Sequence, residues 1–212
     1  MNQNKVLIVG AGFGGLEIAR RLKNSSAHVT IVDRMNHHLF QPLLYQVATC
    51  ALSPSDIAFS IRSICSKSKN TEVVMATVED IDKDNKFVTL ADGTHLYFDT
   101  LILAPGASHS YFNHPEWEQY APGLKTIQDA QHIREKILMA FEKAERASSF
   151  DMALPYLRFA IVGGGPTGVE MAGAIAEIAF KSLAKEYKKT KLEHATIFLL
   201  EGADQILPGY PK

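Results

Sequence analysis

Residues 5–15 read KVLIVGAGFGG, and residues 159–168 read FAIVGGGPTG. In each stretch a short, continuously apolar run leads into glycines with the spacing G-x-G-x-x-G. Such runs are typical of strands buried on both faces of a parallel sheet. In this spacing the first glycine makes a tight turn, the second lets the backbone approach a pyrophosphate, and the third lets helix and strand pack closely. The chain therefore carries two predicted dinucleotide-binding turns.

The residues after the first turn complete a strand–turn–helix–strand unit. Leu16, Ala19 and Leu22 recur at helical spacing, and the apolar run Val29–Val32 then ends at Asp33. Phosphates favour the N-terminus of such a helix, where free N–H groups and the helix dipole attract negative charge. An acid at the end of the second strand hydrogen-bonds ribose hydroxyls. This order of elements makes the first glycine turn a specific signal.

The second turn is followed by the same elements. We predict a helix over Val169–Leu183 and a strand over Thr196–Leu200, which ends at Glu201. No Arg or Lys occurs in Gly202–Asp204, and an acid repels the 2′-phosphate of NADP, so the second unit favours NADH. In the first unit Arg34 follows the acid, a pair compatible with the adenosine end of FAD. The predicted fold class is α/β, with two Rossmann-like βαβ units, one for FAD and one for NAD(H).

The segment after the first unit has no single period. Pro42 and Pro54 interrupt residues 36–62, so we expect a loop and then a helix that opens near Ser53 or Ser55.

A small antiparallel meander is predicted next. Val73–Ile81 and Phe87–Leu90 alternate apolar and polar residues, and His95–Phe98 follows an Asp-Gly turn signal. Thr100–Leu103 returns to the pattern of a buried strand.

An amphipathic helix is predicted over residues 127–147, with Thr126 as its N-cap and Asp129 at the capping-box position. We expect three parts in the chain, with both nucleotide-binding domains incomplete. They are an FAD-binding Rossmann-like domain over residues 1–115, a connector and amphipathic helix over residues 116–150, and the first half of an NAD(H)-binding domain over residues 151–212.

The composition is that of an ordinary globular protein. Of 212 residues, 46% are hydrophobic and 21% are charged, and the formal net charge is −1. This near-neutral balance gives no electrostatic reason to expect a nucleic-acid partner. No run approaches the ~20 apolar residues of a membrane span, and the N-terminus lacks the pattern of a secretory signal. We expect the chain itself to be soluble.

The cysteines and one pair of histidines suggest no metal or redox chemistry. Cys50 and Cys65 form neither a C-x-x-C pair nor a metal-ligand cluster, so we expect reduced, structural thiols and no bound metal. His37 and His38 are adjacent, and on an extended chain their side chains point to opposite sides. A surface or packing role is expected for both.

Several stretches resemble one family of flavoproteins. Two glycine turns about 150 residues apart, with LILAPGA at residues 101–107 between them, look like the two-dinucleotide-binding flavoprotein superfamily. Within it, HHLFQPLLYQVATCALSPSDIAFSIR (37–62), FAIVGGGPTGVEMAGAIAE (159–177) and LLEGADQILPGY (199–210) resemble type II NADH:quinone oxidoreductases. The resemblance implies hydride transfer from NADH to FAD and then electron transfer to a membrane quinone, as in a respiratory chain. The cofactors carry that chemistry, and the protein binds and orients them.

The resemblance also implies a role for each matching residue. Gln46 and Thr49 would lie near the isoalloxazine edge, and Glu170 would face the nicotinamide–flavin junction; Gln46 and Glu170 are the candidate catalytic residues. The candidate FAD-binding residues are Gly10, Gly12, Phe13, Gly14 and Gly15 at the pyrophosphate, Asp33 and Arg34 at the adenosine end, Val78 at the adenine, and Ala104 and Gly106 at the phosphate end. The candidate NADH-binding residues are Gly163, Gly165, Pro166, Thr167 and Gly168 at the pyrophosphate and Glu201 at the ribose.

The length of the chain departs from the family, whose members are roughly twice as long. We therefore expect an N-terminal half whose own FAD binding and activity are open. For the parent protein we expect a peripheral position on the cytoplasmic face of the inner membrane, held by a C-terminal part absent here, with a homodimer left open.

Two other functions remain open. One is a non-catalytic nucleotide-binding fragment, and the other is a flavoprotein reductase of the ferredoxin or rubredoxin type. Residues 66–212 contain no cysteine, which argues against a sulfide:quinone oxidoreductase.

Overall fold

Four parallel strands form the sheet of the first of two units into which the chain divides. The computed structural model describes residues 3–210. The first unit joins the residues up to Leu39 with Ala58–Ser108, and the second joins Phe40–Ile57 with the residues from His109 onward. The domain boundaries predicted after residues 115 and 150 differ from these bounds. Residues 40–57, which the prediction placed in the first domain, pack with the second unit. The three-part division into domains stays a prediction.

The parallel sheet of the first unit has the strand order β5-β2-β1-β9. Its central strand β1 pairs with β2 on one side and with β9 on the other, so that Ile8 lies beside Ile31 and Ile102. The strands are β1 (Lys5–Val9), β2 (His28–Asp33), β5 (Thr71–Met75) and β9 (Thr100–Leu103). The strands predicted over Lys5–Val9, Val29–Val32 and Thr100–Leu103 are confirmed, but β9 is only partly buried, with Leu103 exposed. The region predicted as one strand over Val73–Ile81 is two, because β5 joins the parallel sheet and β6 belongs to the meander.

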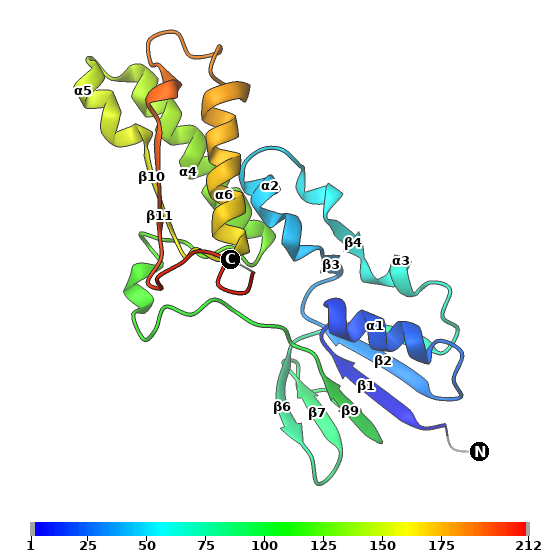
Figure 1. The fold of residues 1–212 in the computed structure, drawn as a ribbon. Helices are drawn as coiled ribbons and strands as arrows, with labels where there is room; N and C mark the ends of the chain where they lie inside the picture. The colour runs from blue at the N-terminus through cyan, green and yellow to red at the C-terminus, as the bar shows by residue number, and fades with distance from the viewer. Residues whose placement is uncertain (1–2, 211–212) are drawn as a thin grey trace. The chain divides into compact units, whose positions relative to one another are not determined.

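Each face of this sheet is covered by different elements. Helix α1 (Phe13–Leu22) lies against β1 and β2, as Figure 1 shows. The residues that pack on the helix side include Val6, Ile8, Val29 and Ile31 from the strands, Ala19 from α1, and Ile61 and Cys65 from α3 (Ile61–Cys65). The other side packs against an antiparallel meander of β6 (Val78–Asp82), β7 (Phe87–Leu90) and β8 (His95–Tyr97).

Alternation along the strands produces these two layers. Leu7 and Val32 point to the meander side, where they pack with Val88, Leu90 and Phe98. Side chains of this size each contribute roughly 1.5–3 kcal/mol when fully buried. A one-residue slip of β1 would exchange its two faces, so the register is strongly specified.

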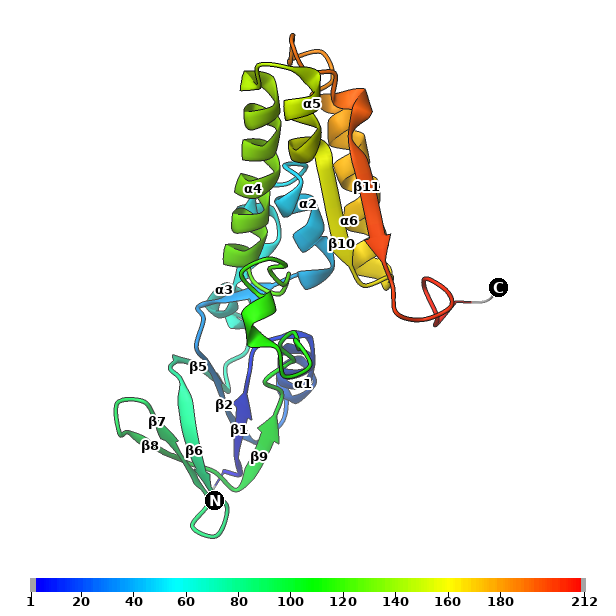
Figure 2. The ribbon, with the colours of Figure 1, turned by 90° about the vertical axis from the view of Figure 1, so that its left-hand side faces the viewer.

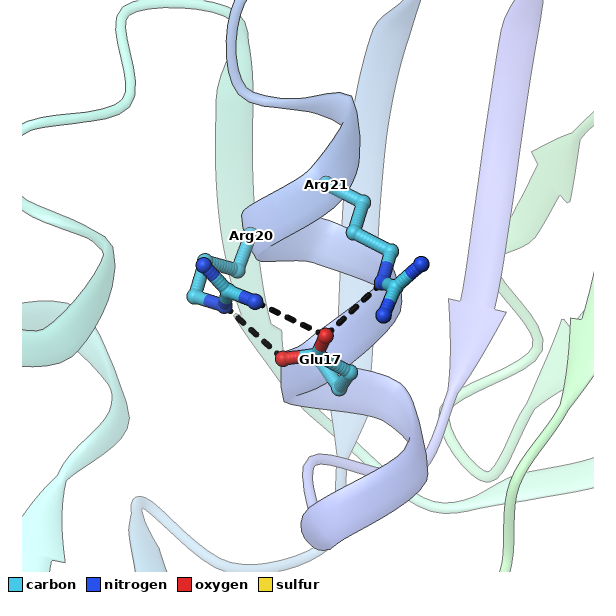
Figure 3. A network of polar contacts seen from close by, with 3 residues as sticks. All are labelled: Glu17, Arg20 and Arg21. Carbon is cyan, nitrogen blue, oxygen red and sulfur yellow. Dashed lines mark hydrogen bonds and ion pairs between the residues drawn. The ribbon is translucent and has the colours of Figure 1, made fainter.

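The exposed face of α1 carries a small ion-pair network. Glu17 contacts Arg20 and Arg21 at 2.8 and 2.7 Å, as Figure 3 shows. Hydrogen bonds from Arg20 first and then Arg21 lower the pKa of the Glu17 carboxyl to about 2. Exposed pairs of this kind contribute little to stability, so the network does not explain the fold.

The second unit combines a two-stranded parallel sheet with helices. Strand β10 (Arg158–Val162) pairs with β11 (Thr196–Leu200), and α6 (Pro166–Glu177) packs against both strands. Helix α4 (Ile127–Arg146) begins as predicted, because Thr126 and Asp129 form a capping box in which each side chain accepts a hydrogen bond from the other's backbone N–H. The short helix α5 (Phe150–Ala153) follows α4.

Residues 36–62 differ from the prediction. They contain β3 (His37–Leu39), α2 (Leu44–Ala48) and β4 (Ala58–Ser60), and β3 pairs with β4 in an antiparallel ribbon. The expected loop is wrong at α2, where Leu44, Val47 and Ala48 are buried at i, i+3 and i+4. One and a half turns are too short to show a helical period.

The helix expected near Ser53 or Ser55 is also wrong. Ser53 starts only a 3₁₀ turn over Pro54–Asp56, and α3 begins at Ile61 with Ser60 as its cap.

Helix α2 packs against α4 and α6 within the second unit, and Figure 2 shows α2 beside α4. The helix predicted over Val169–Leu183 ends earlier, and a π-helical turn over Ile178–Ser182 follows α6. Within residues 3–210 no helix is both long and apolar enough to cross a membrane.

The third glycine of the first turn gives a testable prediction. A Cβ at Gly15 would overlap the carbonyl oxygen of Gly10 and lie 3.3 Å from the Ile8 side chain, whereas one at Gly14 would lie 3.8 Å from the Ala104 Cβ. We expect Gly15→Ala to lower the free energy of unfolding by about 1–3 kcal/mol. Gly14→Ala, the matched control, should change it by less than about 1 kcal/mol, in the stabilising direction. Urea unfolding followed by circular dichroism measures both, and equal losses would refute the packing argument.

Candidate functional site

The first glycine turn follows β1 directly. Gly10 has a φ of 101°, a left-handed conformation that side chains rarely adopt, and its N–H donates to the carbonyl of Val32 at 2.8 Å. A Cβ at Gly10 would overlap the backbone of Ala104. The turn is therefore pressed against the ends of β2 and β9 and requires glycine at this position.

Asp33 at the end of β2 holds the middle of this turn. One carboxylate oxygen accepts from the Ala11 N–H at 2.6 Å, and the other accepts from the Met35 N–H at 2.8 Å. Ala11 is buried, so its N–H needs a partner within the protein. Asp33, which the sequence motif predicted to bind the ribose, therefore also fixes the turn.

The second turn repeats these contacts. Gly163 has a φ of 107°, and its N–H donates to the carbonyl of Leu200 at 2.8 Å. The carboxylate of Glu201 accepts from the Gly164 N–H at 2.6 Å and from the Ala203 N–H at 2.9 Å. The hydrogen bonds from Ala203 first and then Gly164 lower the pKa of the Glu201 carboxyl below its usual value. Glu201 is therefore ionised at neutral pH.

The third glycine has the same role in both units. A Cβ at Gly15 would overlap the carbonyl oxygen of Gly10, and a Cβ at Gly168 would overlap that of Gly163. Only glycine lets each helix cross its turn this closely.

The second glycine of each turn leaves open space at a helix N-terminus. A Cβ at Gly12 or Gly165 would meet nothing within 4 Å, and these residues are the N-caps of α1 and α6. No side chain caps either helix. Pro166 and Thr167, both exposed, form the first positions of α6. Each helix start therefore fits a pyrophosphate, because the first turn of a helix has N–H groups without intrahelical partners and the helix dipole attracts negative charge.

The remaining candidate FAD residues lie at the carboxyl ends of the parallel strands. Arg34, which is exposed, follows β2. Val78 is the first residue of β6, and two residues before it the N–H of Ala76 donates to the Asp33 carbonyl at 2.9 Å. Ala104 and Gly106 follow β9. Phe13 opens α1, and its ring lies edge-on to that of His38, with the ring centroids 5.1 Å apart. Ligands of open α/β sheets bind at this edge.

A pocket in the second unit brings the other candidates together. It has a volume of about 470 Å³, and its wall includes Gln46, Thr49 and Glu170. The first two come from α2 and its end and the third from α6, more than 100 residues along the chain. The other lining residues are Tyr45, Cys50, Ala51, Leu138, Ala174, Glu177, Ile178, Ser182 and Leu183.

Local hydrogen bonds hold the α2 side of the pocket. The Thr49 hydroxyl, which is buried, donates to the Tyr45 carbonyl at 2.7 Å, and the Gln46 side-chain amide donates to the Tyr45 hydroxyl at 3.0 Å. Cys50 follows the C-cap Thr49 and has a φ of 65°. The end of α2 is thus held by hydrogen bonds within residues 45–49.

Part of this pocket was not predicted from the sequence. Ala174 and Glu177 lie four and seven residues after Glu170, so helical spacing alone places them on the same face of α6. Glu177 could therefore have been predicted from its spacing to Glu170. Tyr45 and Ser182 could not, because neither α2 nor the π-helical turn was expected.

The fold and the two turns define an α/β protein with two repeated dinucleotide-type βαβ units. A family model described as pyridine nucleotide-disulphide oxidoreductase matches residues 4–212, and the chain belongs to this family. Cys50 and Cys65 are both free thiols.

Individual relatives confirm the resemblance found in the sequence. The chain is 42% identical over 209 residues to the Type II NADH:quinone oxidoreductase Ndh of Mycobacterium tuberculosis, which covers 97% of this chain and 45% of that protein. It is 33% identical to the external alternative NAD(P)H-ubiquinone oxidoreductase B2, mitochondrial, of Arabidopsis thaliana, with 99% and 38% covered. The chain thus spans less than half the length of these curated relatives.

Solved structures show the same fold. NDH2 from Plasmodium falciparum in complex with NADH superposes with a TM-score of 0.90 at 28% identity, over 100% of this chain and 44% of that chain. The sulfide:quinone oxidoreductase of Aquifex aeolicus has a TM-score of 0.64 at 18% identity, which shows likeness of fold alone. The predicted α/β class with Rossmann-type units is confirmed.

The bond between Asp33 and Ala11 gives a second prediction. Asp33→Ala leaves the buried Ala11 N–H without its acceptor, which costs about 1–3 kcal/mol. Amide hydrogen exchange should show protection of Ala11 falling roughly tenfold, since tenfold corresponds to ~1.4 kcal/mol. Asp33→Asn keeps one carbonyl oxygen and should lose less. Asp99→Ala removes a comparable bond to the Lys5 N–H and should leave Ala11 unchanged; a drop there too would mean general loosening.

Proposed function

We propose that this chain is part of an FAD-dependent oxidoreductase that transfers hydride from NADH to FAD and electrons on to a membrane quinone. The main support for this function is the repeated glycine turn. In both units a carboxylate at the end of a strand accepts a hydrogen bond from an N–H of the turn at 2.6 Å. Relatives named NADH:quinone oxidoreductases at 42% and 43% identity support the reaction. Because the chain spans under half of them, the activity of the whole protein is part of the proposal.

In this proposal the first unit holds FAD. The α1 N-terminus at Gly12 binds the pyrophosphate through backbone N–H groups, and the open space beside Gly12 supports this assignment. Asp33 accepts from the ribose with the lone pairs that its two backbone bonds leave. Arg34 and Val78 lie at the same sheet edge, where the adenosine end would bind.

The second unit holds NADH by the same means. The α6 N-terminus, from Gly165 to Gly168, receives the pyrophosphate, and Glu201 accepts from the ribose hydroxyls. A 2′-phosphate would meet the Glu201 charge, so the acid favours NADH over NADPH.

The pocket lined by Gln46, Thr49 and Glu170 is proposed to receive the reacting end of a substrate. When flavin and nicotinamide are both bound, they supply the hydride chemistry. The carboxylate of Glu170 can accept from an amide N–H, and the amide of Gln46 can donate to a carbonyl. These two side chains would orient the ring, and the apolar side chains Leu138, Ala174 and Ile178 would keep water from it.

The reaction is tested on the 212-residue chain supplied with FAD. We expect NADH, added without oxygen, to bleach the flavin absorbance, and a soluble quinone to restore it. Glu170→Gln should slow bleaching by about tenfold or more while NADH affinity changes little, because only orientation is lost. Glu142→Gln, at an exposed position of α4 that does not line the pocket, is the control. FAD binding without bleaching would contradict the catalytic proposal for this chain.

A non-catalytic nucleotide-binding role for this chain is the second candidate, supported by the two glycine turns alone. It predicts bound nucleotide and no bleaching. A reductase of the ferredoxin or rubredoxin type rests only on fold likeness, since the NADH:rubredoxin oxidoreductase of Clostridium acetobutylicum is 20% identical. A protein acceptor that restores the flavin faster than quinone would favour it.

The Glu201 charge gives a prediction on cofactor choice. Glu201→Gln keeps an oxygen that accepts from the Gly164 N–H but removes the negative charge. We expect the preference for NADH over NADPH to fall by about tenfold or more, since a charge pair near 4 Å contributes ~1–4 kcal/mol at a protein surface. Titration calorimetry with both nucleotides measures the ratio. Glu193→Gln, before β11, should not change it, and an unchanged ratio in Glu201→Gln would contradict the assignment.

We further propose that the parent protein lies peripherally on the cytoplasmic face of the inner membrane, where its quinone resides.

A further inference from the structure

We propose that His38 is a positioning residue of the first glycine turn, which holds the Ala11 carbonyl so that the next amide faces the dinucleotide. The sequence indicated only a surface or packing role for this histidine. The identity of the dinucleotide, FAD, rests on the function proposed above. The hydrogen bond itself does not.

The imidazole of His38 is bonded to the turn. Its Nδ1 lies 3.1 Å from the carbonyl oxygen of Ala11, 27 residues earlier in the chain. A carbonyl oxygen only accepts, so Nδ1 carries the hydrogen and donates. The edge-to-face contact with Phe13 fixes the ring plane, and the pairing of His38 with Phe59 across β3 and β4 fixes its backbone. The donor is therefore held by its own strand β3, by β4 and by the start of α1.

Peptide planarity turns this bond into control of a ligand-facing group. The Ala11 carbonyl and the Gly12 N–H belong to one trans peptide, so they point in opposite directions. Holding the carbonyl toward His38 aims the Gly12 N–H away from it. Asp33 holds the preceding peptide through the Ala11 N–H. Both peptides that flank Ala11 are thus fixed just before α1, whose N-cap is Gly12.

The second unit shows that this carbonyl needs a donor. Gly164 occupies the position of Ala11, and its carbonyl accepts from the Leu207 backbone N–H at 2.8 Å. Its own N–H is held by Glu201, as that of Ala11 is held by Asp33. Both turns therefore hold the middle residue at both ends. Only in the first unit does a side chain supply the donor for the carbonyl.

His37 provides a matched control one residue away. Its Nδ1 lies 3.2 Å from the Asn36 side-chain oxygen, and it contacts no residue of the turn in the described contacts. A change at His37 alters the same ribbon without altering the bond to Ala11.

The first test needs no ligand. Long-range ¹H–¹⁵N spectra of the 212-residue chain, recorded above the titration range of histidine, report which ring nitrogen is protonated. We expect the Nδ1–H tautomer at His38. The Nε2–H tautomer there would overturn the proposal.

The second test separates the hydrogen bond from packing. The Asn amide nitrogen stands two bonds from Cβ, as Nδ1 does, so His38→Asn keeps the donor, whereas His38→Phe keeps the ring and loses it. We expect His38→Phe to weaken FAD binding about five- to tenfold, the loss of one positioning hydrogen bond, with His38→Asn and His37→Phe within about twofold of wild type. Fluorescence titration measures the affinity, and thermal unfolding checks that each variant is folded.

The outcomes separate the two proposals. If His38→Asn binds FAD as weakly as His38→Phe, or His37→Phe as weakly as either, packing rather than the donor decides affinity and the inference fails. If the wild-type chain shows the Nδ1–H tautomer but no affinity for FAD, the proposed FAD function of this unit fails while the bond between His38 and the turn stands.

Discussion

The bond from a strand-end carboxylate to the glycine turn is the constraint on which both units depend. Asp33 and Glu201 each accept a hydrogen bond from the middle N–H of a turn at 2.6 Å. Each also accepts a hydrogen bond from the backbone N–H two residues after itself. The turn is thereby tied to the neighbouring strand rather than only to the strand it follows. With the turn fixed, the start of the following helix is fixed as well.

The same constraint explains why these positions tolerate so little change. A turn tied to the second strand passes so close to its own helix that the third glycine faces the carbonyl of the first. In the first unit the turn also meets the backbone that follows β9, which excludes a side chain at Gly10. Preorganisation of this kind lowers the ordering cost of binding in general, because a backbone that is already fixed loses less conformational freedom when a ligand binds.

Much of this arrangement could be predicted from the sequence, because its signals are local. The strands of both βαβ units, the glycine turns and the capping box of α4 each depend on residues within a few positions of one another. Helix α2 could not be predicted, since its five residues follow Pro42 and are held by packing against α4 and α6. The bond between His38 and Ala11 depends on a contact over a long sequence separation, which the sequence did not reveal. The proximity of Gln46 and Glu170 was implied only by the family resemblance and not by residue spacing.

The pocket is formed entirely by residues of the second unit. Gln46 and Thr49 lie between β3 and β4 in the sequence, yet residues 40–57 pack with the second unit, which also carries Glu170 and the second turn. The two candidate catalytic side chains therefore share a framework with the proposed NADH site. Their mutual position is set by the packing of α2 on α6 and by the Tyr45 hydrogen bonds. The segment that most resembles the family in sequence is thus the one whose placement depends on tertiary packing.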